Sequence, residues 1–217
     1  MRRALAIVVF TLASVAILLY SLRPGAQFDW KEGIGFITGL WCVWLTILKN
    51  VWNFPIGIAN SFFLGIVFLG GRLFADAGLQ LMFIALGFQG WWLWLHGGAR
   101  RTELPVGVAN RIDFWQSAAL TLIALPLFTW RLTLIKDAAP FWDAAITVFS
   151  VVAQVLLNRK RIENWWVWLG VDLVSVWLYA VKHFYLTAVL YAIYCAMAVW
   201  GYTAWRKDLA LKEPRLA

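Results

Sequence analysis

The chain has 217 residues, of which 63% are hydrophobic and 14% are charged, and its formal net charge is +8. This composition is too apolar for a soluble protein of this size. The basic residues lie in short clusters between apolar runs, a distribution typical of membrane topology rather than of nucleic-acid binding. We therefore expect a polytopic membrane protein that lies in the lipid bilayer and has no nucleic-acid partner.

Eight apolar runs of helical length follow one another along the chain. About 20 residues of α-helix cross the roughly 30 Å hydrocarbon core of a bilayer, so each run is long enough to span it. The runs lack the alternating pattern of outer-membrane barrels. The sequence predicts an all-α fold with about eight transmembrane helices, near 4–22, 33–48, 54–72, 77–95, 113–130, 140–157, 165–181 and 184–204.

The first run begins with Met1, Arg2 and Arg3, as a signal peptide would. It is longer than a typical signal core, and no clear small-x-small cleavage site precedes Phe28, so we expect a retained helix. With eight spans, 13 Lys and Arg residues share the side of the two termini and 6 lie on the other side. The positive-inside rule then predicts that both termini are cytoplasmic.

The third run contains two amides, in the segment Trp52-Asn-Phe-Pro-Ile-Gly-Ile-Ala-Asn60. Asn53 and Asn60 are seven residues apart and therefore lie on one face of a helix. Polar side chains are expensive at membrane depth and usually serve a solute path. An amide both donates and accepts, which suits an uncharged polar ligand. The alternative is that these amides only hydrogen-bond a neighbouring helix.

The end of the fourth run combines an amide with several tryptophans. Gln89 and Trp92 share one face of this helix, whereas Trp91 and Trp94 share another. Gln89 is a candidate polar group at the middle of the membrane, and Trp94 is a candidate ligand contact. The alternative for the tryptophans is an aromatic belt at the membrane surface.

The seventh run places two aromatic rings and a carboxylate on one face, because Trp165, Trp168 and Asp172 fall at i, i+3 and i+7. Such a set could stack a heteroaromatic ring and hold a ribose hydroxyl or a cationic ring. Alternatively, Trp165 anchors the helix at the membrane surface and Asp172 pairs with a Lys or Arg of another helix. In the last run, Tyr191 belongs to an aromatic stripe suited to packing or to ligand contact.

The second to fourth runs resemble the sixth to eighth. An alignment with a one-residue gap pairs Asn60 with Asp172, and each unit ends in Gly-x-x-x-Trp, at 90–94 and 201–205. Two three-helix units separated by one helix point the same way across the membrane, as in SWEET-type transporters, where substrate binds near the midplane. The expected parts are an extra N-terminal helix (1–32), a first unit (33–96), a linker (97–139), a second unit (140–206) and a cytoplasmic tail (207–217).

No motif indicates catalysis or a bound cofactor. The sequence has no phosphate-binding loop, no His-x-x-x-His zinc pair and no nucleophile beside a plausible base. Cys42 and Cys195 lie far apart in apolar runs, without metal-ligand spacing. We expect neither an enzyme, nor a cofactor, nor a metal site.

At these residues the chain resembles the PnuC family of nicotinamide riboside transporters. The matching segments run in order as 52–60, 73–80, 89–94, 161–168, 171–172 and 186–191. The resemblance implies a SWEET-like 3+1+3 core and a homotrimer in the cell inner membrane. It also implies facilitated diffusion of nicotinamide riboside, which cytoplasmic phosphorylation traps for NAD synthesis.

The resemblance further implies one substrate site at the interface of the two units, built here from Asn60, Gln89, Trp168 and Asp172. Gln89 is a departure, because many relatives are expected to carry an aromatic residue there. Related branches carry thiamine or riboflavin, so another aromatic vitamin remains an alternative substrate. A protein of a different class, a non-transporting membrane scaffold, could use the same polar groups only to join helices.

Overall fold

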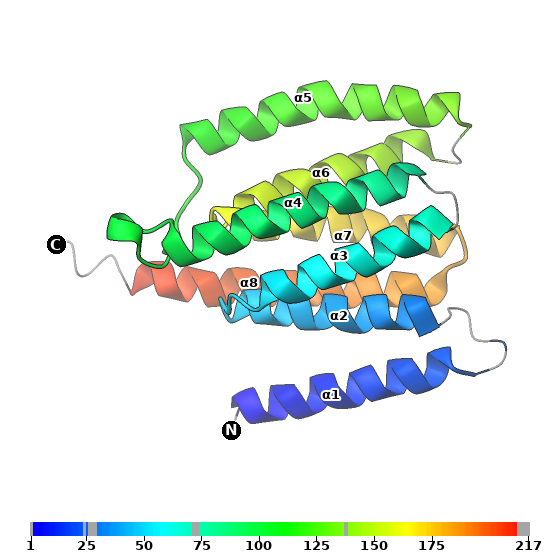
Figure 1. Ribbon diagram of the computed structural model, residues 1–217, viewed down its shortest axis with the longest axis horizontal. Coiled ribbons are helices and arrows are strands. Elements are labelled where there is room, and N and C mark those ends of the chain that lie inside the picture. The colour runs from blue at the N-terminus through cyan, green and yellow to red at the C-terminus, as the bar shows by residue number, and fades with distance from the viewer. Residues whose placement is uncertain (1, 24, 26–29, 71–73, 137–138, 212–217) are drawn as a thin grey trace. The chain divides into compact units, whose positions relative to one another are not determined.

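The structure is a computed structural model that describes the chain apart from residues 1, 24, 26–29, 71–73, 137–138 and 212–217. The described residues form α-helices joined by short loops, together with one turn of 3-10 helix at 99–101, and no strand element (Figure 1). The eight α-helices are α1 (Arg2–Ser21), α2 (Trp30–Ile47), α3 (Asn53–Gly70), α4 (Phe74–His96), α5 (Arg111–Leu134), α6 (Pro140–Asn158), α7 (Asn164–Val181) and α8 (Tyr185–Ala210). The predicted all-α fold is confirmed.

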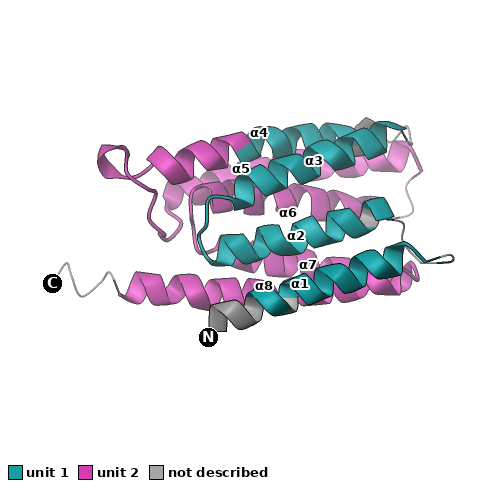
Figure 2. Cartoon of the chain, turned by 60° about the horizontal axis from the view of Figure 1, so that its bottom comes forward, with its two compact units in different colours: residues 1–87 teal, residues 88–217 magenta. Residues whose placement is uncertain are grey.

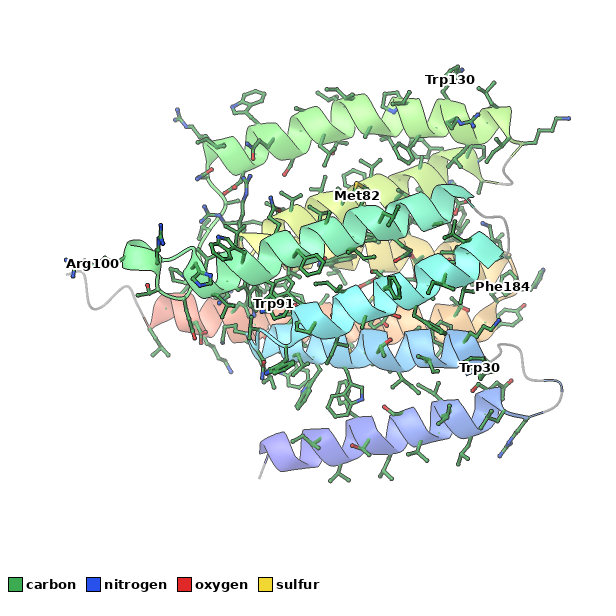
Figure 3. All side chains as sticks on the ribbon, viewed as in Figure 1. Trp30, Met82, Trp91, Arg100, Trp130 and Phe184 are labelled. Carbon is green, nitrogen blue, oxygen red and sulfur yellow. The ribbon has the colours of Figure 1, made fainter. Side chains whose placement is uncertain are left out.

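Within the described residues, five helices are long and apolar enough to cross a membrane: α3, α4, α5, α6 and α8. The described apolar stretches of α1 and α2 are shorter, and α7 carries Asn164 and Asp172 among its apolar residues. On α5, Trp130 projects away from the helix (Figure 3) and 61% of its surface is exposed, as suits a side chain that meets lipid. The chain is a multi-pass membrane protein.

The chain divides into two compact units, residues 1–87 and 88–217 (Figure 2). In the first unit, α1 packs against α2 and α2 packs against α3. In the second unit, α5 packs against α6, α6 against α7 and α7 against α8. The boundary falls inside α4, so Gln89 and Trp94 belong to the second unit.

The core of the second unit is built around three tryptophans. The Trp205 ring lies 6.0 Å from that of Trp94 and 5.4 Å from that of Trp165, measured between ring centroids. The Trp94 Nε1 group donates a hydrogen bond of 3.1 Å to the Leu157 carbonyl oxygen, which satisfies the buried indole. Gly201 makes room for this packing, because a Cβ at that position would lie 2.5 Å from the Trp165 ring.

Replacement of Gly201 by alanine is therefore expected to destabilise the second unit by about 1–3 kcal/mol, the usual cost of overpacking a core. Gly170 is the matched control, because a Cβ there meets nothing within 4 Å. Gly170→Ala is expected to be neutral or to stabilise its helix by roughly 0.5–1 kcal/mol. Thermal unfolding of the purified variants measures both effects. Equal melting temperatures for the two variants would show that the tryptophan core is packed differently.

The two halves of the chain, α1–α4 and α5–α8, repeat their local structure without a gap. Helix α3 begins at Asn53 and α7 begins 111 residues later at Asn164. The turns that precede these helices also correspond, because Lys49 (φ 58°) and Lys160 (φ 49°) both have left-handed backbone conformations. Each of these lysines donates its amide to the carbonyl oxygen three residues earlier, at 2.9 and 2.8 Å.

The same spacing relates other parts of the two halves. The core residues Trp94 of α4 and Trp205 of α8 are also 111 positions apart. The loops before α2 and α6 contain left-handed residues at Gly25 (φ 79°) and Lys136 (φ 59°), so α1 and α5 hold equivalent positions along the chain. The one-residue gap in the predicted alignment is therefore wrong. The gapless spacing pairs Asp172 with Ser61 rather than with Asn60.

Candidate functional site

One face of α7 carries the main cluster of candidate groups. Trp168, Asp172, Ser175 and Tyr179 are spaced by four, three and four residues, so their side chains leave the helix on the same side. Trp165 lies one turn earlier on the same side of α7, and its ring already packs against Trp205 in the core. Helix α7 starts just before this face. Its first residue, Asn164, donates its Nδ2 group to the Arg161 carbonyl oxygen at 2.5 Å and so fixes the first turn.

Two polar groups on this face, the Asp172 carboxyl and the Ser175 hydroxyl, have no protein partner among the described residues. Asp172 is 6% exposed, and within the described part of the chain no hydrogen bond or ion pair reaches its carboxyl group. Ser175 is fully buried, and no described residue hydrogen-bonds its hydroxyl. Leaving a buried polar group unsatisfied costs about 1–3 kcal/mol. A polar ligand could hydrogen-bond both the Asp172 carboxyl and the Ser175 hydroxyl. The predicted pairing of Asp172 with a Lys or Arg is not seen among the described residues.

Aromatic side chains of α8 lie next to this face. The Tyr191 ring stacks on that of Tyr179, with centroids 5.3 Å apart and an interplanar angle of 9°. Tyr194 meets Tyr191 edge-on at 5.9 Å. The Asp172 carboxyl group lies close enough to Tyr191 and Cys195 to interact with them electrostatically. The structure thus brings two of the predicted residues, Asp172 and Tyr191, to one place.

The structure gives Trp168 and Trp94 different surroundings. Trp168 is half-buried, and no ring contact or hydrogen bond to its side chain is found within the described ranges, so its face is available to a ligand. Trp94 is 2% exposed and packs in the core. Its ring also lies 4.3 Å below the Lys160 Nζ atom. The surroundings of Trp94 are those of a packing residue.

Gln89 takes part in a chain of amides that the sequence analysis did not identify. The Gln154 Nε2 group donates to the Asn158 Oδ1 atom at 2.9 Å, and the Asn158 Nδ2 group donates to the Gln89 Oε1 atom at 3.2 Å. Asn158 is fully buried, whereas Gln89 is exposed. The only sequence signal was the i, i+4 spacing of two amides at the end of the apolar run that forms α6.

The two predicted residues of the first unit also differ from each other. Asn53 is buried at the start of α3, where its Nδ2 group donates to the Asn50 carbonyl oxygen at 2.8 Å, just as Asn164 does at the start of α7. Asn60 lies two turns further along α3, and its buried Oδ1 atom has no hydrogen-bond partner among the residues that the structure describes. Asn53 therefore shapes a turn, while Asn60 keeps an acceptor available for a ligand.

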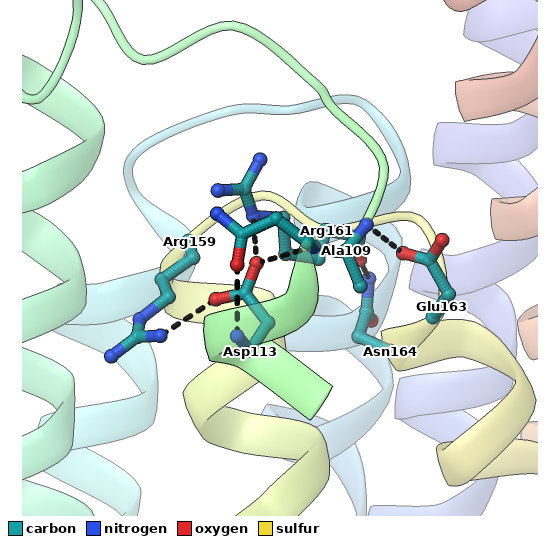
Figure 4. Close-up of polar contacts among 7 residues, drawn as sticks. Ala109, Asp113, Arg159, Arg161, Glu163 and Asn164 are labelled. Carbon is teal, nitrogen blue, oxygen red and sulfur yellow. Dashed lines mark hydrogen bonds and ion pairs between the residues drawn. The ribbon is translucent and has the colours of Figure 1, made fainter. Parts of the chain in front are cut away.

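An ion cluster around one buried carboxylate ties the start of α5 to the turn between α6 and α7 (Figure 4). The Asp113 side chain is 1% exposed, and its two oxygens lie 2.6 Å from Arg159 Nη1 and 2.8 Å from Arg161 Nε. Asp113 and Asn110 also cap each other at the start of α5, with hydrogen bonds of 3.0 and 2.9 Å. Nearby, the Ala109 amide donates to Glu163 Oε2 at 2.8 Å.

The Asp113→Asn variant is expected to lose about 2–3 kcal/mol of stability, because two arginines then lack their buried counter-ion. Asp143→Asn is the matched control. Its carboxylate pairs with Lys182 at 3.2 Å, but both side chains are about 30% exposed, so the loss is expected to be at most about 1 kcal/mol. Thermal unfolding of the purified variants measures the difference. A larger loss for Asp143→Asn than for Asp113→Asn would contradict this assignment.

No metal site is formed in the part of the chain that the structure describes, since no three His, Cys, Asp or Glu side chains come together there. The candidate groups of the second unit are aromatic rings, amides, a hydroxyl and one carboxylate. Such groups recognise an organic molecule with a ring and several polar substituents.

Comparison with known proteins agrees with this chemistry. A family model described as nicotinamide mononucleotide transporter matches residues 29–207. The nicotinamide riboside transporter PnuC of Escherichia coli is 29% identical over 210 residues, which cover 83% of this chain and 87% of that protein. The riboflavin/roseoflavin transporter RibM of Streptomyces davaonensis is 30% identical over 185 residues, which cover 81% of this chain and 84% of that protein.

The fold is also that of a solved structure. A crystal structure of the vitamin B3 transporter PnuC matches with a TM-score of 0.72 and 22% identity, covering 95% of this chain and 91% of that one. The likeness extends over nearly the whole of both chains. The protein is thus a membrane transporter for a vitamin. Because the family model spans most of its length, the chain belongs to the PnuC family of nicotinamide riboside transporters.

Proposed function

We propose that the protein carries nicotinamide riboside into the cell by facilitated diffusion. The observation that carries this proposal is the α7 face. Within the described part of the chain, the Trp168 ring there has no ring contact, and the buried Ser175 hydroxyl, which has no hydrogen-bond partner, lies one turn from the buried Asp172 carboxyl. Nicotinamide riboside has a flat cationic ring and a ribose. The ring stacks on Trp168, and the carboxylate of Asp172 faces the positive charge or accepts from ribose hydroxyls.

The mechanism we propose is uniport, without coupling to an ion. The apolar runs contain no series of acidic residues of the kind that relays protons, and Asp172 is the only acidic residue in the middle of a predicted span. Net uptake would then be driven by cytoplasmic phosphorylation, which removes the transported riboside and supplies NAD synthesis. We propose further that the protein is a homotrimer in the inner membrane, as the family resemblance implies. The distribution of Lys and Arg favours a cytoplasmic location for both termini.

Riboflavin is a second candidate substrate, favoured by the relative that transports it at 30% identity. The same face suits its flat ring on Trp168 and its chain of hydroxyls on Asp172 and Ser175. Riboflavin is uncharged, however, so it gives the buried carboxylate no cation to face. Nicotinamide riboside is the better match to the charge at this position.

Uptake into lipid vesicles that contain the purified protein tests the proposal. We expect saturable entry of labelled nicotinamide riboside with no ion gradient or membrane potential, and acceleration when the vesicles are preloaded with unlabelled riboside. Uptake that needs a proton or sodium gradient would contradict uniport. Transport of riboflavin or thiamine in place of the riboside would reassign the substrate, and no flux of any of the three would favour a scaffold.

A further inference from the structure

The amide chain of Gln154, Asn158 and Gln89 has a direction. Gln154 donates to Asn158, and Asn158 donates to Gln89. Among the described residues no hydrogen bond from the Gln89 NH₂ group is found, so the chain ends in a donor group. The middle amide is fully buried, whereas the Gln89 side chain is exposed. A buried amide thus holds an accessible one through a hydrogen bond.

The internal repeat shows that packing alone does not require these amides. The residues 111 positions away are Val43 for Gln154, Ile47 for Asn158 and Trp200 for Gln89. The equivalent helices of the other half therefore carry apolar side chains at all three places. Ile47, the counterpart of Asn158, is itself 1% exposed, so an isoleucine fits a buried position of this kind. Amides that packing does not require are candidates for contact with the solute, and this chain lies where α6 ends.

We propose that Asn158 is a positioning residue that holds the Gln89 Oε1 atom toward α6, so that the Gln89 NH₂ group points to the substrate. The substrate atom that meets Gln89 must then be an acceptor, and a carbonyl oxygen is the matching group. This inference rests on the proposed function, in which the carboxamide oxygen of nicotinamide riboside supplies that acceptor. Asn158 would select the carboxamide without touching it.

The experiment compares uptake of nicotinamide riboside with uptake of pyridine riboside, which has the same charged ring and ribose but no carboxamide. We expect the wild-type protein to prefer nicotinamide riboside by roughly 3- to 10-fold in KM, the range for one neutral hydrogen bond. In Asn158→Ile, we expect the KM for nicotinamide riboside to rise to near that for pyridine riboside. The KM for pyridine riboside and the kcat for both should stay near their wild-type values.

The Gln89→Met variant keeps the inference testable if Asn158→Ile folds poorly, because the Gln89 side chain is exposed and its loss opens no buried cavity. It is expected to lose the same preference, and the double variant is expected to lose no more than either single one. A fall in uptake of both ribosides by the same factor in Asn158→Ile, or an unchanged preference in Gln89→Met, would overturn the inference alone. Failure of the wild-type protein to take up either riboside would instead overturn the proposed function.

Discussion

Trp168→Ala is expected to weaken nicotinamide riboside binding by about 10- to 100-fold, because ring stacking contributes on the order of 1–3 kcal/mol. The Trp168 ring is half-buried on the α7 face and has no ring partner within the described residues. Its removal should therefore lower substrate affinity and leave the melting temperature nearly unchanged. Isothermal titration of the purified protein with nicotinamide riboside measures the affinity.

Trp166→Ala is the matched control for this variant. Trp166 lies two residues earlier, on the opposite side of α7, and is 56% exposed. Its ring contacts Tyr202, with centroids 4.8 Å apart, and does not belong to the α7 face that carries Asp172. We expect wild-type affinity from Trp166→Ala. Similar losses in the two variants would mean that the effect of Trp168→Ala is structural.

Replacement of Asp172 by asparagine is expected to separate a cationic substrate from a neutral one. The carboxylate is 6% exposed, so its charge acts in a medium of low dielectric constant, where it attracts a pyridinium ring strongly. We expect Asp172→Asn to lower the affinity for nicotinamide riboside by about 10-fold or more, since charge-assisted contacts are worth about twice a neutral hydrogen bond.

The chemically matched comparison for this variant is a neutral riboside of reduced nicotinamide, whose ring has the same substituents but no charge. Its affinity should change little, because asparagine still accepts and donates hydrogen bonds to ribose hydroxyls. Competition of both compounds against labelled nicotinamide riboside measures the two affinities. Equal losses for the charged and the neutral compound would show that Asp172 holds the ribose rather than the ring.

Much of the fold could be predicted from the sequence because the bilayer imposes long apolar helices. The predicted span 140–157 differs by one residue at its end from α6, which ends at Asn158. The repeat was predicted with the wrong register, because the turns that fix it are recognised by backbone conformation. Lys49 and Lys160 are left-handed in the structure, yet neither is the glycine that normally signals such a turn.

The candidate site could be predicted only where its groups share one helix. The shared face of Trp168 and Asp172 on α7 could be predicted, because side chains four residues apart lie on the same side of a helix. The contact of Asn158 with Gln89 joins residues 69 positions apart, and the pair of Asp113 with Arg159 joins residues 46 apart. No periodicity within one helix reveals such contacts, since tertiary packing creates them.

The assignment of the substrate to the α7 face is the central claim, and a structure of the protein with nicotinamide riboside bound tests it most directly. We predict that the pyridinium ring stacks on Trp168, with a polar group of the riboside within hydrogen-bonding distance of Asp172 or Ser175. A riboside bound away from α7, with Trp168 and Asp172 both free of ligand, would contradict the account.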